Sequence, residues 1–390
     1  MSKNIALFID GTWNNAALTQ QTNVHKLYLA AHAVSEPSIL DDDGIPVAPP
    51  NARQVVHYLN GVGTGGYLDT CVGGATGFGT SEKIKEAYLF IAMNYQRGDN
   101  VYLFGFSRGA FAARSLAAFV AVVGWTLKDK PSWNKVDAAY VMYVQAGGRA
   151  RIDQALMDDL EISRGQLVES RPIPIRLIGV WDTVKMTVHP DSPKLPNHIT
   201  NARHALALHD LRPEFEPTLW EDWDQNKQSL EQVWFPGAHS NVGGGYANTD
   251  LSDAALLWMA CESNNLGLDL HLTKLQVLKT LPGAVYEEKR MGYPLKPRAI
   301  LSNWSSNAHR RMIESFFIHK TTCAQLLNTS TGQYWKDCLK VIDKLKNNPE
   351  NRKLVSRQND TYSHLLTEVD DLALKLYLTL SFKYGKHPVQ

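Results

Sequence analysis

One stretch of the sequence decides the fold: Val101-Tyr-Leu-Phe-Gly-Phe-Ser-Arg-Gly-Ala110. Its first half is rich in β-branched and aromatic residues, which favour a short buried strand. The apolar segment 110–125 predicts a packed helix directly after it. Strand, Gly-x-Ser-x-Gly turn and helix in this order are typical of a nucleophile elbow. We therefore expect Ser107 to stand exposed at the carboxyl end of the strand, between two glycines whose places leave no room for a β-carbon.

Composition limits the kinds of protein that this chain can be. Its 390 residues can bury the core of one large α/β domain with insertions, or of two domains. The 40 Lys+Arg residues nearly balance the 39 Asp+Glu residues, so a nucleic-acid partner has no electrostatic support. The four cysteines lie far apart and without ligand spacing, which argues against a disulfide framework and a zinc site. We expect no metal and no cofactor.

The N-terminus gives an expectation about location. The chain passes from Ser2-Lys3-Asn4 directly into the strand-like segment 5–9, which leaves no room for a signal peptide. No apolar run approaches the ~20 residues that span a bilayer. The chain is therefore expected to be cytoplasmic as synthesised, and any export would need a leaderless route.

The periodicity of apolar residues outlines an α/β architecture. Buried strands are predicted at 5–9, 54–59, 101–106, 175–181 and 232–235. A helix predicted over 81–96 carries the chain between two of these strands, which implies a right-handed crossover and a parallel sheet. The other expectations are a surface loop at 35–52, a helical insertion or cap at 126–170, and helices beginning at 201–209 and 253–262.

Two further strand ends carry residues that complement a serine nucleophile. Asp182 follows the strand 175–181, and His239 follows the strand 232–235 on a glycine-rich loop. A serine hydroxyl needs a neutral imidazole to take its proton, and a carboxylate to orient and stabilise that imidazole. Ser, Asp and His occur here in the chain order of α/β-hydrolase triads. Rival bases remain, and they are His25, His204 and His209.

The loop after the first predicted strand, Asp10-Gly-Thr-Trp-Asn14, is the candidate oxyanion loop. Its Gly11 and Thr12 amides, together with the Arg108 amide, are candidate donors to the oxyanion of a tetrahedral intermediate. The alternative is that Asp10 and Thr12 merely fix a turn. An aspartyl-phosphate phosphatase is excluded, because Phe8 stands where its nucleophilic carboxylate would have to be.

A second glycine-rich segment, Gly61-Val-Gly-Thr-Gly-Gly66, matches the dinucleotide-binding fingerprint. The glycines that follow, from Gly73 to Gly79, should prevent the helix whose N-terminus would hold the pyrophosphate. We expect a loop that borders the active site. The residues Trp220 and Trp223 have two interpretations, because they could receive acyl chains or simply pack.

Four blocks of the sequence resemble a known family. They are Phe8-Ile-Asp-Gly-Thr-Trp-Asn14, Gly105-Phe-Ser-Arg-Gly-Ala110, Gly179-Val-Trp-Asp-Thr-Val184 and Trp234-Phe-Pro-Gly-Ala-His-Ser-Asn-Val-Gly-Gly-Gly-Tyr246. They are similar to the signature blocks of a bacterial and fungal α/β-hydrolase family that includes the first class of type VI secretion lipase effectors, which are phospholipases A. The resemblance implies Ser107 as nucleophile, Asp182 as acid and His239 as base. Where the family usually has His-Ser-Asp, this chain has Asn241, which removes a charge but no triad member.

The resemblance spans about residues 4–262 and sets the expected organisation. It implies an α/β-hydrolase-like catalytic domain at 1–264. Residues 265–390 lie outside the match, and their weaker periodicity predicts a mainly helical extension that packs on or caps that domain. The implied substrate is a phospholipid or another acyl ester, with contact to a membrane surface and with secretion-apparatus and immunity proteins as partners. Two alternatives stay open: an esterase or thioesterase for small soluble substrates, and a non-catalytic binding protein on a hydrolase fold.

Overall fold

The computed structural model describes most of the expected catalytic domain and little beyond it. The described residues are 2–11, 20–41, 44–61, 78–123, 132–145, 173–184, 194–207, 210, 212, 215–235, 237–275 and 316–318. Thr12, His209, the glycine-rich segment 62–77, and most of the predicted insertion and C-terminal extension lie outside these residues.

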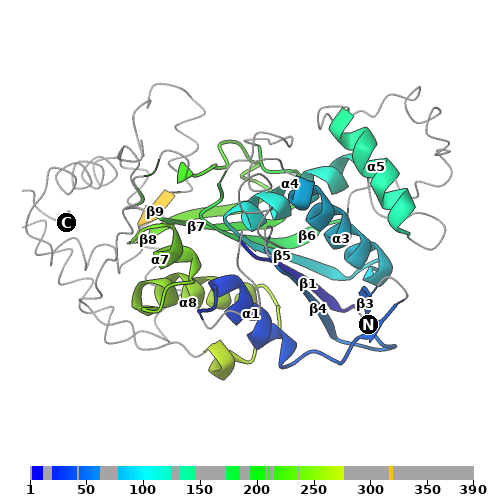
Figure 1. Ribbon diagram of the computed structural model, residues 1–390, viewed down its shortest axis with the longest axis horizontal. Helices are drawn as coiled ribbons and strands as arrows, with labels where there is room; N and C mark the ends of the chain where they lie inside the picture. The colour runs from blue at the N-terminus through cyan, green and yellow to red at the C-terminus, as the bar shows by residue number, and fades with distance from the viewer. Residues whose placement is uncertain are drawn as a thin grey trace, which may run out of the picture.

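The centre of the molecule is a seven-stranded sheet with the order β4-β1-β5-β6-β7-β8-β9 (Figure 1). The strands are β1 Asn4–Ile9, β4 Gln54–Leu59, β5 Asn100–Phe106, β6 Ile175–Trp181, β7 Asn201–Ala207, β8 Ser229–Phe235 and β9 Phe316–Ile318. Every neighbouring pair in this sheet runs parallel. The predicted α/β fold with a mostly parallel sheet is therefore confirmed, and all strands bring their carboxyl ends to one edge.

Helices cover both faces of the sheet, with α3 and α4 on one face and α1 and α8 on the other (Figure 1). The helices are α1 Asn23–His32, α3 Phe78–Asn94, α4 Arg108–Val123, α5 Trp133–Gln145, α7 His239–Gly243, α8 Asp250–Asn265 and the 3₁₀ turn η3 Leu272–Leu275. Alternation along β1 explains the two layers, because successive side chains of a strand point to opposite faces. Leu7 joins the core under α3 and α4, whereas Phe8 joins the core with α1 and α8.

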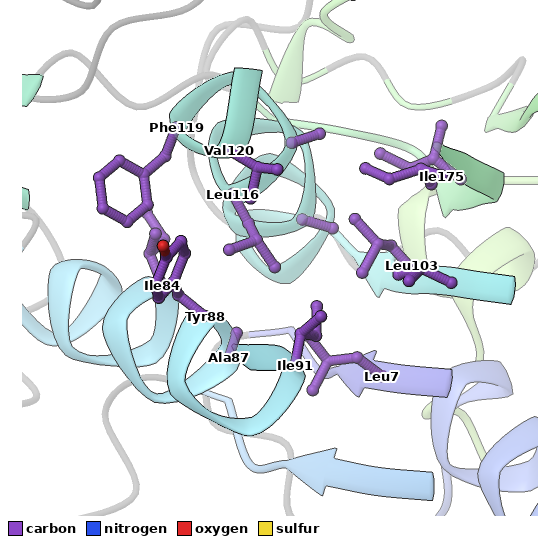
Figure 2. Close-up of a cluster of buried hydrophobic side chains, with 14 of the residues drawn as sticks. Leu7, Ile84, Ala87, Tyr88, Ile91, Leu103, Leu116, Phe119, Val120 and Ile175 are labelled. Carbon is purple, nitrogen blue, oxygen red and sulfur yellow. The ribbon is translucent and has the colours of Figure 1, made fainter. Parts of the chain in front are cut away.

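The core beneath α3 and α4 confirms the predicted apolar face of α3. Figure 2 shows Ile84, Ala87, Tyr88 and Ile91 of this helix turned toward the sheet and α4. They pack with side chains of the sheet and of α4, which include Leu7, Leu103, Ile175, Leu116, Phe119 and Val120. Burying a large aliphatic or aromatic side chain contributes roughly 1.5–3 kcal/mol. This core fixes the start of α4 against the ends of β1 and β5.

The strand order reverses between β1 and β5. From β1 the chain passes through α1 to β4 on one side, and then through α3 to β5 on the other side of β1. The chain after β1 thus leads to α1 on one face of the sheet, and the chain after β5 leads to α4 on the other. In open α/β sheets, ligands bind at such a switch point, outside the carboxyl ends of the strands.

The structure corrects some predicted elements. The residues expected to begin a helix at 201–209 form the fully buried strand β7, because pairing with β6 and β8 overrides the helical propensity of an alanine-rich segment. The predicted loop 35–52 contains the short antiparallel pair β2 (Ile39–Leu40) and β3 (Pro46–Val47). Helix α3 begins at Phe78 and so includes Gly79, which we expected in a loop.

Residues beyond the expected domain boundary also contribute to the sheet. Strand β9 pairs in parallel with β8, from Gln232↔Phe316 to Trp234↔Ile318. The division of the chain at residue 264 stays a prediction. None of the helices in the described part of the chain is long and apolar enough to cross a membrane.

Candidate active site

The turn after β5 has the geometry predicted for a nucleophile elbow. Ser107 adopts a φ of 59°, which is rare for a residue other than glycine, and α4 begins at Arg108. A β-carbon on Gly105 would lie 2.5 Å from the carbonyl oxygen of Gly109, and one on Gly109 would lie 2.3 Å from that of Ile9. The expected need for both glycines is confirmed.

The expectation that Ser107 is exposed was wrong, since the residue is only 8% exposed. The reason is that the turn is packed against the end of β6. The Ser107 amide donates to the Trp181 carbonyl over 3.0 Å, and the Val184 amide approaches the Ser107 carbonyl at 3.5 Å.

Asp182 and His239 meet at the same edge of the sheet. Nδ1 of His239 lies 2.7 Å from Oδ2 of Asp182, and both side chains are buried. The other carboxylate oxygen of Asp182 accepts a hydrogen bond from the Ala207 amide over 2.9 Å. The carboxylate is therefore fixed by the main chain of β7 and faces the imidazole with its second oxygen.

The strand register brings the serine turn close to this pair. Phe106 of β5 pairs with Trp181 of β6, so Ser107 and Asp182 are the next residues on two adjacent strands. The ring of His239 lies against Phe106, with centroids 4.5 Å apart. The three residues predicted from their positions in the sequence thus gather at one place.

We expected His239 on a glycine-rich loop, but it is the first residue of the short helix α7. Asn241 stabilises the start of this helix, because its Oδ1 accepts the Ala238 amide over 3.0 Å and its amide donates to the Ala238 carbonyl over 2.9 Å. Asn241 therefore has a capping role.

The rival histidines that the structure describes have other surroundings. Nε2 of His204 accepts the Thr183 amide over 3.2 Å, inside the sheet. His25 lies on α1, where its ring packs against Tyr58 and Tyr28, and burial lowers the pKa of its imidazole. The third rival, His209, lies outside the described residues.

The candidate oxyanion donors differ in what surrounds them. The Arg108 amide belongs to the first turn of α4. The Gly11 amide donates to Oδ1 of Asp10 over 2.7 Å, so it is engaged by the neighbouring carboxylate. Thr12 lies outside the described residues.

Asp10 itself forms a buried cluster that the sequence did not predict. Its Oδ2 accepts the hydroxyls of Thr22 and Tyr58, each over 2.6 Å. Burial raises the pKa of the Asp10 carboxyl to about 6, although these two hydroxyls and the Gly11 amide lower it. The cluster ties the loop after β1 to α1 and β4.

A second carboxylate near His239 was also missed. Asp210 is 2% exposed and accepts the His239 amide on Oδ2 over 3.1 Å. Its position just beyond β7 is the signal that could have revealed it, since carboxyl ends of parallel strands share one edge. That signal was hidden because we expected a helix over this segment.

The remaining predicted side chains near the site have structural surroundings. Trp220 and Trp223 are buried in the core, which supports the interpretation that they pack rather than receive acyl chains. The guanidinium of Arg114 covers the Trp220 ring at 4.5 Å. In the described residues, no group of three or more His, Cys, Asp or Glu side chains could hold a metal ion.

A parallel sheet between helical layers, with a strained serine turn at its carboxyl edge, defines an α/β-hydrolase-like protein. Residues 3–262 match the catalytic domain of the Tle1-like phospholipase effectors of type VI secretion. The chain belongs to this family. The match ends close to the predicted domain boundary.

The matches to individual proteins cover only part of this chain and of each relative. An uncharacterised protein of Saccharomyces cerevisiae is 26% identical over 235 residues, which are 55% of this chain and 32% of the yeast protein. The crystal structure of an uncharacterised protein from Pseudomonas aeruginosa has 17% identity and a TM-score of 0.43, and covers 71% of this chain and 47% of that one. The Tle1 effector bound to the VgrG spike has 20% identity and a TM-score of 0.34, with 63% and 51% covered. This chain thus spans a third to a half of these relatives.

Proposed function

We propose that this protein is a serine hydrolase that cleaves carboxylic esters of phospholipids as a phospholipase A. Ser107 is the nucleophile, His239 the general base and Asp182 the acid that orients it. The observation that carries the proposal is the 2.7 Å approach of His239 Nδ1 to Asp182 Oδ2, next to the strained turn of Ser107. Membership of a phospholipase effector family supports lipid-ester hydrolysis.

The proposed reaction has two halves. Ser107 Oγ attacks the ester carbonyl while Nε2 of His239 takes the hydroxyl proton, and the Arg108 amide stabilises the oxyanion. The tetrahedral intermediate expels the lysophospholipid alcohol, which receives that proton from His239 and leaves an acyl-enzyme on Ser107. Water then attacks the acyl-enzyme while the same imidazole takes its proton. The second tetrahedral intermediate releases the fatty acid, and His239 returns the proton to Ser107 Oγ.

The proposal extends to a role as an exported antibacterial effector, with secretion-apparatus and immunity proteins as partners. The family description names type VI secretion and so supports this part. Export depends on partners outside this chain, whereas hydrolysis depends on the chain's own residues, so the hydrolase activity is the part to test first.

A fluorophosphonate probe tests the nucleophile. Folded wild-type protein should be labelled, and Ser107→Ala should not. Equal labelling of both would overturn the proposal, and labelling of neither would favour a non-catalytic binding protein. Ser115→Ala is the control. It removes the hydroxyl of a buried serine in α4, the helix that begins next to Ser107, and it should leave labelling intact.

Mass spectrometry of lipid products tests the substrate class. Purified protein incubated with mixed phospholipid vesicles should release equimolar lysophospholipid and free fatty acid. Cleavage of short-chain soluble esters without any lysophospholipid would instead support the esterase or thioesterase alternative. The position of the acyl chain that remains on the lysophospholipid distinguishes A1 from A2 specificity.

A further inference from the structure

Two residues beyond β7, Asp210 and Phe215, contact His239. Asp210 is buried, and its Oδ2 accepts the main-chain amide of His239 over 3.1 Å. Helix α7 begins at His239, and amides in the first turn of a helix have no acceptor within the helix. Asp210 therefore supplies the acceptor that holds the start of this helix.

Arg212 holds Asp210 with both ends of its guanidinium. Its Nε donates to Oδ1 over 2.9 Å and its Nη2 donates to Oδ2 over 2.6 Å. The Arg212 amide also donates to Oδ1, over 3.1 Å. A bidentate pair of this kind fixes both position and orientation, which a single point contact does not. The arginine also compensates the charge of a carboxylate that lies close to His239.

Arg212 also contacts Phe215, whose ring packs against the imidazole of His239. Its guanidinium lies 3.6 Å from the ring centroid of Phe215. Phe215 in turn meets the His239 ring edge to face, with centroids 4.8 Å apart and an interplanar angle of 77°. Phe106 contacts the imidazole as well, so two aromatic rings and one carboxylate limit its movement.

We infer that Asp210, Arg212 and Phe215 form a positioning unit for His239. Asp210 holds the backbone of the base, Phe215 holds its ring, and Arg212 fixes both and cancels the charge of Asp210. This inference rests on the proposed role of His239. It assigns no contact with substrate to the three residues, which act through the base.

The opposite charges of Asp210 and Arg212 allow a test that distinguishes positioning of the base from a merely structural role. The titratable groups near the imidazole, as far as the structure describes them, are Asp182 after β6, Asp210 and Arg212 after β7, and Tyr246 after α7, which interacts electrostatically with Arg212. Arg212→Gln leaves the Asp210 charge uncompensated, which favours the protonated imidazole. Asp210→Asn leaves the arginine charge uncompensated, which disfavours it.

The measurement is the pH profile of kcat/KM for a soluble p-nitrophenyl ester, using the full chain. The acid limb should move to higher pH in Arg212→Gln and to lower pH in Asp210→Asn, by about 0.5–1 unit each. Because the base is displaced, kcat should fall between about tenfold and a hundredfold with little change in KM. Shifts in the same direction, or none, would overturn the inference.

A matched control separates positioning from general loss of stability. Arg203 on β7 and Glu262 on α8 form another buried ion pair, with Nε and Oε2 2.5 Å apart. Glu262→Gln should lower the melting temperature and leave kcat and the pH profile unchanged. If it lowers kcat as much as Asp210→Asn does, positioning is refuted.

Phe215 variants keep the inference testable if Asp210→Asn fails to fold. Phe215→Ala should lower kcat about tenfold, and Phe215→Tyr, which keeps the ring, should restore it. Equal rates in the two variants would count against the unit. An inactive wild-type protein that also fails to label would instead refute the proposed hydrolase function itself.

Discussion

Ser107 and Asp182 are neighbours on adjacent strand ends, and both have positive φ angles, 59° and 40°. Among the described residues, Asn51 is the remaining non-glycine residue with this property. Left-handed conformations cost a residue with a β-carbon about 1–2 kcal/mol. Strain of this kind persists where the surroundings enforce it, and it is concentrated at functional sites. Two of the three such positions in the described residues are those proposed for nucleophile and acid.

The strain at Ser107 predicts opposite effects on stability and activity. The free energy of unfolding of Ser107→Gly should exceed that of Ser107→Ala by about 1 kcal/mol, because glycine adopts the left-handed conformation without a steric cost. Urea denaturation measures this difference. Both variants should lose turnover by a factor on the order of 10⁶. Asn51→Gly is the control, and it should gain less, since asparagine tolerates positive φ. Equal stability of the two Ser107 variants would contradict the strain.

The contacts of Asp182 predict the result of removing its charge. In Asp182→Asn the Ala207 amide still requires the carbonyl oxygen, so the side-chain NH₂ group faces His239 Nδ1. The imidazole is then held in the tautomer that cannot accept the serine proton, and kcat should fall about 10⁴-fold. Asp99→Asn, at the opposite edge of the sheet beside Lys3, should retain activity. Near-normal turnover in Asp182→Asn would remove Asp182 from the proposed triad.

The buried contacts of His204 predict a structural phenotype. In His204→Leu the Thr183 amide loses its acceptor inside the sheet, which should lower the free energy of unfolding by about 1–3 kcal/mol. The folded fraction should still react with a fluorophosphonate at the wild-type rate. Urea denaturation and labelling of the same preparation measure both quantities. Loss of labelling in folded protein would restore His204 as a candidate base.

Local chemistry was enough to predict much of this fold and site. The apolar strand, the two crowded glycines and the helix after them are contiguous in sequence, and each residue constrains its neighbours directly. Asp182 and His239 could be found because each comes soon after a strand with a clear apolar pattern, so a parallel sheet alone brings them to one edge.

Other features depend on contacts that are distant in sequence. The segment Asn201–Ala207 contains alanine, leucine and arginine, which suit a helix, and only its two parallel neighbours make it a strand. Asp210 was missed together with that strand. The hydroxyl donors of Asp10 lie 12 and 48 residues away, and no periodicity in the sequence reveals such a meeting.

The buried Asp10 carboxyl predicts how stability depends on pH. Burial raises its pKa from 3.8 to about 6 in the folded protein, so the folded state binds the proton more tightly than the unfolded state does. The contribution of Asp10 is therefore most favourable below pH 4 and is lost as the pH rises through 6. A shift of about two units corresponds to about 3 kcal/mol.

Asp10→Asn cannot ionise and should lack this loss. The free energy of unfolding of Asp10→Asn, minus that of wild type, should therefore increase by about 2 kcal/mol between pH 4 and pH 7. Glu36 gives a control of opposite sign, because hydrogen bonds from the Arg53, Glu36 and Gln54 amides outweigh its slight burial and lower the pKa of its carboxyl. The free energy of unfolding of Glu36→Gln, minus that of wild type, should thus decrease as the pH rises from 4, because ionised Glu36 stabilises only the wild-type protein. Urea denaturation at pH 4, 5, 6 and 7 measures both trends. Parallel curves for wild type and Asp10→Asn would mean that Asp10 ionises in the folded protein as easily as in the unfolded chain.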